Sequence, residues 1–404
     1  MKYWKEAASL IVAANRRNGI FHPHTISSST AAKEKGEEKL SNRNKIRKIN
    51  DGNVIVRHHC ESDFSILLMQ RAQSSSFFAG AEVFPGGALD NADTSPDWLE
   101  FFEEAGISTK DFGKMLSVQG QRPLVFTNKQ TSPLPREVAF RICAIRETFE
   151  EAGLLLLKSF KDIPHKKTEV TFAKNYEHPS LSEVTIDEWR RRVHGDASQF
   201  IMLCRELQCV PDVWSLMEWC DWLTPATNKK RYDTMFFLCC MNDVPLVKHD
   251  AQEMIQTKWS LPTEALQSFQ DKQVYLPPPQ IYELSRIENF KSLQDLFDFS
   301  SQRAFLGCET TFPVLYLSED GKVVSAYPGD DIYPKVPEFK TINAGEMAVL
   351  NKTAEQSLKE SKNVNRMVFK DSTECSLYYN IIPRFGHVAP ALFNNPDSDV
   401  QSKL

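Results

Sequence analysis

Hydrophobic residues in this chain form short blocks that predict strands, separated by segments with helical periodicity. Short, mostly apolar blocks bounded by polar residues are typical of buried strands. We expect strands at 8–14, 64–69, 154–157, 234–241 and 255–259. Apolar residues three and four positions apart predict helices at 137–152, 262–269 and 280–287. This mixture of elements predicts an α/β fold.

Two polar segments interrupt the pattern. Residues 15–53 are rich in Ser, Lys, Glu and Asn, which predicts an insertion between two strands. Residues 94–138 break the pattern a second time. We therefore expect one domain over 1–265 that contains both insertions, followed by an extension over 266–401 that packs on it.

Local signals predict a hairpin and two sharp breaks. Val54–Val56 is expected to pair with the strand at 64–69, with His58–Asp63 as the turn. The sequence Phe84-Pro85-Gly86-Gly87 ends regular structure, and its two glycines would let the backbone approach a ligand closely. Gly153 fits the C-terminus of the helix at 137–152.

The composition is that of a globular protein. Of the 404 residues, 41% are hydrophobic, which is enough to form a sizeable core. The net charge is -5 and charges of both signs are interspersed, so DNA is not an expected partner. No apolar run approaches the roughly 20 residues that cross a bilayer, so membrane insertion is not expected. The nine cysteines lack a Cys-x-x-Cys pair and are expected to be reduced, mostly buried thiols.

Both ends of the sequence resemble targeting signals to different degrees. Basic residues surround the apolar stretch at 8–14, but Glu6 and the strand pattern favour a core strand over an organelle presequence. The last three residues are Ser402, Lys403 and Leu404. Ser-Lys-Leu at a C-terminus is a peroxisomal address that an import receptor reads. We therefore expect a peroxisomal location and that receptor as a partner.

Three carboxylates share one face of the predicted helix at 137–152. A rotation of about 100° per residue brings Glu147, Glu150 and Glu151 together. Like charges at this spacing repel, so the cluster requires a cation, and Mg²⁺ or Mn²⁺ prefer oxygen ligands. Arg146 lies one turn from Glu150 and is placed to orient the cluster. From this helix alone, a solvated acidic face is an equal alternative.

The residues around this helix resemble the Nudix box, Gly-x5-Glu-x7-Arg-Glu-U-x-Glu-Glu-x-Gly-U, where U is aliphatic. Gly87, Asp93 and residues 146–154 supply the matching positions. Asp93 replaces the first Glu of the box, and Thr148 replaces an aliphatic residue. In addition, 52 residues separate Asp93 from Arg146, where the box has seven, which indicates an insertion inside the box. The resemblance implies that the catalytic residues are Arg146, Glu147, Glu150 and Glu151, the three glutamates being the metal ligands.

A second acidic segment lies inside that insertion. Residues 99–107 match the second half of the box except that Leu99 stands where Arg is required. The distance from Gly87 is also short by two residues, and Phe101 and Phe102 fit a helix that packs on the domain. We therefore predict that the metal site belongs to the later helix.

A box split in this way resembles the peroxisomal acyl-coenzyme A diphosphatase branch of the Nudix hydrolases. The resemblance implies a Nudix α/β/α sandwich with a mixed sheet, an insertion within the box and a C-terminal extension. It also implies metal-dependent hydrolysis of coenzyme A and acyl-coenzyme A to 3',5'-ADP and (acyl-)4'-phosphopantetheine. The coenzyme A signature is matched in part, at Leu67, Leu68, Arg71, Gly80 and residues 84–87.

Several assignments within this hypothesis remain open. The residues expected to bind substrate are Arg71, Gly86, Gly87, Lys229, Lys230 and Arg231. The basic run among them would meet a 3'-phosphate, or it is a solvated turn. Glu253 is either a loop carboxylate of the site or part of a salt bridge, so the catalytic base is Glu150, Glu151 or such a loop residue. Alternative functions are a Nudix hydrolase of a dinucleotide, ADP-ribose, nucleotide sugar or RNA-linked diphosphate, or a non-catalytic binding module.

Overall fold

The computed structural model describes residues 3–16, 62–128, 132–163, 170–250, 253–340 and 345–391. Three of the predictions fall outside these residues, wholly or almost so. They are the insertion at 15–53, the strand at Val54–Val56 and the tripeptide at 402–404.

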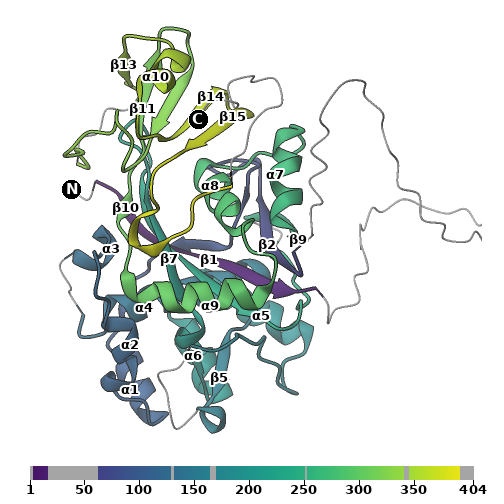
Figure 1. Ribbon diagram of the computed structural model, residues 1–404. Helices are drawn as coiled ribbons and strands as arrows, with labels where there is room; N and C mark the ends of the chain where they lie inside the picture. The colour runs from purple at the N-terminus through teal and green to yellow at the C-terminus, as the bar shows by residue number, and fades with distance from the viewer. Residues whose placement is uncertain are drawn as a thin grey trace, which may run out of the picture.

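A mixed eight-stranded sheet forms the centre of the molecule (Figure 1). Its strand order is β10-β7-β8-β1-β2-β3, with β4 beside β1 and β9 beside β2. The strands are β1 (Lys5–Asn15), β2 (Phe64–Arg71), β3 (Glu82–Val83), β4 (Gly86–Ala88), β7 (Met217–Leu223), β8 (Tyr232–Met241), β9 (Met254–Ser260) and β10 (Thr310–Thr311). The long strand β1 pairs in parallel with β8 and antiparallel with β2 and β4.

Helices cover both faces of this sheet, because its central strands are apolar on both sides. Leu10 and Val12 of β1 join the core beneath helix α4 (Arg136–Ala152), whereas Ile11 and Ala13 join the core on the opposite face. The first face also packs against α5 (Glu183–Gly195) and α6 (Gln199–Leu207). The second face packs against α7 (Pro262–Gln270), α8 (Pro278–Ile287) and α9 (Leu293–Arg303). The α/β/α layering is therefore confirmed.

The domain boundary expected at residue 265 lies within α7, inside the helical layer that covers the second face of the sheet. Helices α8 and α9 complete the cover of the second sheet face, and β10 pairs with β7 at the sheet edge. Burial of the sheet's second face requires these elements, so the central body extends well beyond residue 265.

A smaller sheet follows the central body, with strand order β13-β11-β12-β14-β15 (Figure 1, top). Its elements are β11 (Val314–Ser318), β12 (Val323–Ala326), β13 (Ala348–Leu350), α10 (Ala354–Glu360), β14 (Asn365–Asp371) and β15 (Glu374–Tyr379). Met367 and Leu377 pack into the same core as α8, which docks this sheet on the central body. The small sheet therefore packs on the central body through this core.

The segment between β4 and α4 folds into short helices on one side of the body. These are α1 (Asp97–Glu104), α2 (Gly113–Leu116) and α3 (Leu124–Thr127). Trp98, Phe101 and Phe102 of α1 are buried in the core that also contains α4. The prediction that the two phenylalanines fix α1 on the domain is confirmed.

Two local predictions need correction. Leu154–Leu156 are buried but form no strand, and β5 (Leu157–Ser159) begins only at Leu157, where it pairs with β6 (Cys209–Pro211). Gly86 and Gly87 do not end regular structure, because they form β4 against β1. Gly86 has φ +150, and a Cβ there would overlap the β1 backbone, so glycine permits this pairing.

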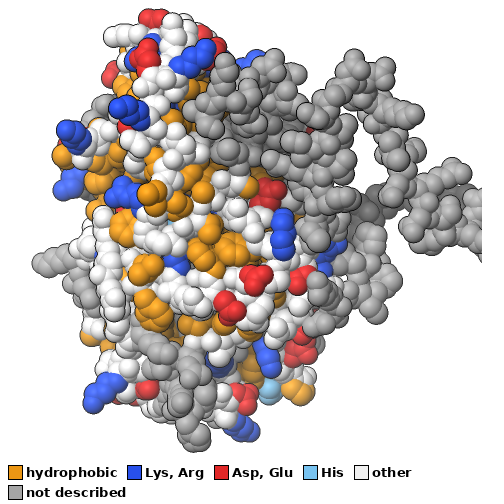
Figure 2. All heavy atoms as spheres, viewed as in Figure 1, with side chains coloured by type: hydrophobic (Ala, Val, Ile, Leu, Met, Phe, Trp, Pro, Cys, Tyr) orange, Lys and Arg blue, Asp and Glu red, His pale blue; other side chains and the backbone are white. Residues whose placement is uncertain are grey.

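The prediction of reduced, buried cysteines holds within the described residues. The eight described cysteines are free and buried. None of the described helices is long and apolar enough to cross a membrane. On the face in Figure 2, acidic and basic side chains of the described residues are interspersed, without a broad basic stripe.

Candidate active site

Arg146 joins the two separated parts of the acidic motif. Its Nε lies 2.7 Å from Asp93 Oδ1, and its Nη2 lies 2.9 Å from Asp93 Oδ2. Its Nη1 lies 2.6 Å from Glu150 Oε1 and 2.9 Å from Glu147 Oε1. Burial is the largest single influence and opposes the charge of Arg146, but Asp93, Glu147 and Cys143 together raise the arginine pKa well above its ordinary value. The fold therefore brings Asp93 onto α4 despite the intervening insertion.

The third glutamate is held by the glycine strand. Glu151 Oε2 accepts a hydrogen bond of 2.9 Å from the Gly86 amide. A Cβ on the next residue, Gly87, would overlap the Glu147 carboxylate. The two glycines thus allow β4 to lie close to β1 and to α4, and this is the role the structure gives them.

Burial disfavours the charged form of all three glutamates. It is the main reason that the pKa of Glu147 is raised to about 8, although Arg146 acts in the opposite direction. Burial also raises the pKa of Glu150, and it raises that of Glu151 well above the ordinary value. Carboxylates in such a place call for a positive counter-charge beyond the single guanidinium of Arg146.

These side chains line a cavity of about 440 Å³. Its lining residues are Ala88, Asp90, Arg146, Glu147, Glu150, Glu151, Val193, His194, Gly195, Asp196, Ala197, Asp250 and Glu253. Carboxylates outnumber cationic groups in this lining, and carboxylate oxygens are the preferred ligands of small divalent cations. The donor set therefore fits a divalent metal ion.

The carboxylates are engaged by the protein's own donors in this structure. Within the described ranges, no three histidine, cysteine or carboxylate side chains are already arranged to hold one metal ion. Glu147 and Glu150 contact Arg146, and Glu151 accepts a hydrogen bond from the Gly86 amide.

Two family models match this chain. The sequence model of the NUDT19 Nudix domain matches residues 4–287, and that of the NUDT19 C-terminal domain matches residues 316–380. The chain belongs to the NUDT19 family of Nudix hydrolases.

Relatives that match most of the chain agree with this family assignment. The chain is 36% identical over 412 residues to a Xenopus laevis protein, covering 100% of this chain and 99% of that protein. It is 40% identical over 353 residues to a Gallus gallus protein (85% and 92% covered) and 38% over 335 residues to a Homo sapiens protein (81% and 86%). All three are named acyl-coenzyme A diphosphatase NUDT19. The chain is thus a Nudix enzyme, and Nudix hydrolases generally use divalent metals.

The substrate-binding residues expected in this NUDT19 relative lie in different environments. The charge of Arg71 favours the ionised form of Glu151, and its Nε donates to Ser75 Oγ at 3.1 Å. Lys229 and Lys230 are exposed. Arg231 is only 4% exposed and donates to the carbonyls of Thr224 (3.0 Å) and Phe339 (2.9 Å). Its guanidinium therefore links two segments of the backbone, whereas the two lysines extend into solvent.

Sequence analysis missed part of the cavity wall. Asp90 lines the cavity from an unspecified position of the box, between Gly87 and Asp93. His194 and Asp250 line it from segments outside the box, whose approach to α4 is a tertiary property. Glu253, which was left open, also lines it. Its backbone carbonyl accepts a bond of 2.9 Å from the Ala72 amide, which connects it to the end of β2.

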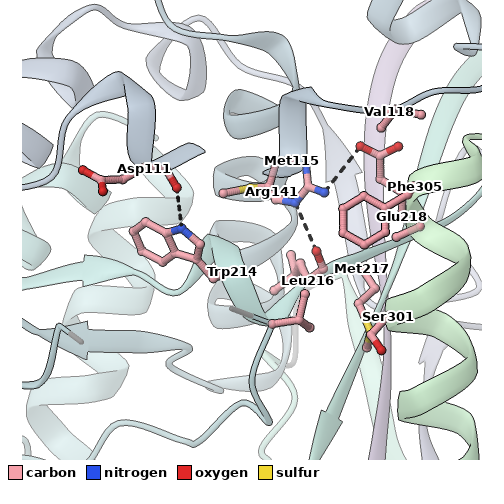
Figure 3. A pocket seen from close by; sticks show the side chains of 12 residues that line it. Asp111, Met115, Val118, Arg141, Trp214, Leu216, Met217, Glu218, Ser301 and Phe305 are labelled. Atoms are coloured by element: carbon pink, nitrogen blue, oxygen red, sulfur yellow. Dashed lines mark hydrogen bonds and ion pairs between the residues drawn. The ribbon is translucent and has the colours of Figure 1, made fainter. Parts of the chain in front are cut away.

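A second cavity, shown in Figure 3, is not a site of the same kind. It lies beside the insertion and α9, and its volume is about 40 Å³. Arg141 lies between Leu216 and Glu218 in this view and donates to Leu216 O (3.1 Å) and to Glu218 Oε1 (3.4 Å). This space admits water but no nucleotide.

Proposed function

We propose that this NUDT19 relative hydrolyses the diphosphate of coenzyme A and acyl-coenzyme A, using Mg²⁺ or Mn²⁺. The observation that carries the proposal is the Arg146 centre, which joins Asp93, Glu147 and Glu150 at the wall of an acidic cavity. The choice of substrate is supported by the name that the three relatives share.

The proposed roles follow from the environment of each residue. Glu147, Glu150 and Glu151 would hold the metal, and Arg146, fixed by Asp93, would orient two of them. A bound divalent ion supplies neutralisation of phosphate charge and a more acidic water. Glu150, Glu151 and Glu253 are the candidates for positioning the attacking water, since all three line the cavity.

Recognition of the 3'-phosphate is proposed for Lys229 and Lys230 rather than Arg231. The two lysines are exposed, whereas the guanidinium of Arg231 is already bonded to two backbone carbonyls. An exposed ammonium contributes modestly to phosphate binding, so discrimination by this pair would be moderate.

Product analysis tests the reaction. With Mg²⁺ or Mn²⁺, acyl-coenzyme A should give 3',5'-ADP and acyl-4'-phosphopantetheine in equal amounts by liquid chromatography and mass spectrometry. A chelator should abolish turnover, and excess metal should restore it. Release of free thiol, or equal use of ADP-ribose, would show that the bond or the substrate is assigned wrongly.

We also propose that Ser402, Lys403 and Leu404, when free at a C-terminus, direct import into peroxisomes. A fluorescent protein fused in front of the full chain should colocalise with a peroxisomal marker. The same fusion without Leu404 should be cytosolic, and puncta that survive this deletion would contradict the proposal.

A further inference from the structure

Helix α5 lies outside the Nudix motif but contacts the catalytic helix directly. Trp189 and Val193 bury their side chains in the core shared with α4. Between them, Arg190 is only 5% exposed and points at the C-terminal turn of α4. An arginine buried this deeply must find fixed hydrogen-bond acceptors.

The acceptors of Arg190 are the backbone carbonyls of two cavity glutamates. Its Nε and Nη2 lie 3.0 Å and 2.8 Å from Glu150 O, and Nη2 lies 2.8 Å from Glu151 O. The last carbonyls of a helix have no partner within the helix, and they carry its negative dipole end. Arg190 therefore fixes the main chain at the two residues whose carboxylates face the cavity.

The same face of α5 reaches the Glu150 side chain one turn later. His194 follows Arg190 by four residues and lines the cavity. Its Nδ1 lies 3.5 Å from Glu150 Oε2, whereas Arg146 binds the other oxygen, Oε1, at 2.6 Å. The Glu150 carboxylate thus lies between Arg146 of the motif and His194 of α5.

We propose that α5 belongs to the active site and that Arg190 and His194 are positioning residues for Glu150. Arg190 acts on the backbone of Glu150, and His194 acts on its carboxylate. The inference rests on the proposed role of Glu150 as a metal ligand. Partners of this kind, which orient a ligand without binding the metal, typically alter metal affinity by 10- to 100-fold when removed.

Mn²⁺ binding to the full-length protein without substrate tests the inference, with electron paramagnetic resonance to count free ion. Arg190→Lys keeps the charge but loses the two-armed contact. Arg191→Lys is the matched control, since Arg191 is exposed on the same helix. His194→Ala removes an imidazole with a 39% exposed side chain, so the fold should tolerate it. Arg190→Lys and His194→Ala should each raise the Kd for Mn²⁺ about 10-fold, and Arg191→Lys should leave it unchanged.

A double variant separates positioning from a general structural effect. If His194 acts through the Glu150 carboxylate, His194→Ala should add almost no loss of Mn²⁺ affinity to Glu150→Gln. Equal losses in both backgrounds, or wild-type affinity in Arg190→Lys and His194→Ala while Glu150→Gln is weakened, would overturn this inference alone. Wild-type affinity in Glu150→Gln would overturn the metal assignment as well.

Discussion

Helices α1 and α4 carry nearly the same acidic sequence but have opposite environments. Each contains Glu-x-x-Glu-Glu-Ala-Gly, starting at Glu100 in α1 and at Glu147 in α4. All three glutamates of α1 are exposed, and Glu104 pairs with Arg205 at the surface. The glutamates of α4 lie in a cavity wall, with side chains of Glu147 and Glu150 only 16% and 7% exposed.

The difference originates in the neighbours of the repeated segment. Arg146 precedes it in α4 and binds Asp93, whereas Leu99 precedes it in α1. In α1 the two positions between glutamates are Phe101 and Phe102, which turn the apolar face inward and the acids outward. A carboxylate motif therefore becomes a site only where the fold supplies a cation partner and a cavity.

The largest expected effect comes from replacing Arg146, the residue before the acidic segment of α4, with the leucine that stands there in α1. Arg146→Leu would leave Asp93, which is 1% exposed, as a buried charge without its partner. Such a loss costs about 3–5 kcal/mol, and turnover should fall with it. Urea unfolding measures the stability change. Leu99→Arg is the converse control and should create no new activity, and full stability of Arg146→Leu would contradict the role given to this contact.

A smaller effect is expected from a methyl group beside Glu147. Gly87→Ala would push the Glu147 carboxylate out of place, since the added Cβ overlaps it. Turnover should fall about 10- to 100-fold with little loss of stability, as expected for a misplaced catalytic group. Gly113→Ala, on the insertion side and with nothing within 4 Å, is the control. Equal turnover of the two variants would argue against a catalytic place for Glu147.

Much of this contrast was visible in the sequence, and the rest depends on tertiary structure. Apolar blocks predicted β1, β2, β8 and β9. The missing arginine in α1 led to the prediction that the metal site lies on α4, and α4 is the helix whose glutamates line the cavity. No local pattern shows that Gly86 and Gly87 form a strand, because that depends on how closely β1 approaches.

Helix α5 carried a local signal that was not used. Ser182 caps it through the Thr185 amide, and Trp189 and Val193 have helical spacing. That Arg190 and His194 of this helix meet α4 follows only from packing.

Two buried aspartates that do not line the cavity can be compared with the glutamates of α4. Asp221 and Asp233 lie on neighbouring strands and are wholly buried. Burial raises the pKa of Asp233 to about 7, and burial together with the charge of Asp233 raises that of Asp221 well above the ordinary value.

This pair should affect the pH dependence of stability and leave catalysis unchanged. The folded state keeps protons that the unfolded chain releases above about pH 4, so a rise from pH 5 to 8 lowers the free energy of unfolding. Asp233→Asn removes a titrating group. Between pH 5 and 8 its free energy of unfolding should therefore fall by at least about 1 kcal/mol less than that of the wild type, and its turnover should be normal. Urea unfolding at both pH values measures this. An unchanged pH slope, or a loss of turnover, would show that Asp233 has another role.

The smallest effect is expected at the exposed lysines. Lys229→Ala with Lys230→Ala should reduce the preference for coenzyme A over dephospho-coenzyme A by about 10-fold or less, because exposed charges contribute little. The ratio of kcat/KM for the two substrates measures it. An unchanged ratio would show that Lys229 and Lys230 do not bind the 3'-phosphate.

The most direct test of the account exchanges one carboxylate in each acidic helix. Metal-dependent release of 3',5'-ADP from acyl-coenzyme A should fall by roughly 100-fold or more in Glu150→Gln, because a catalytic metal supplies several kcal/mol. Glu103→Gln, at the equivalent position of α1, should match the wild type. Full activity in Glu150→Gln with loss in Glu103→Gln would contradict the account and place the catalytic centre on α1.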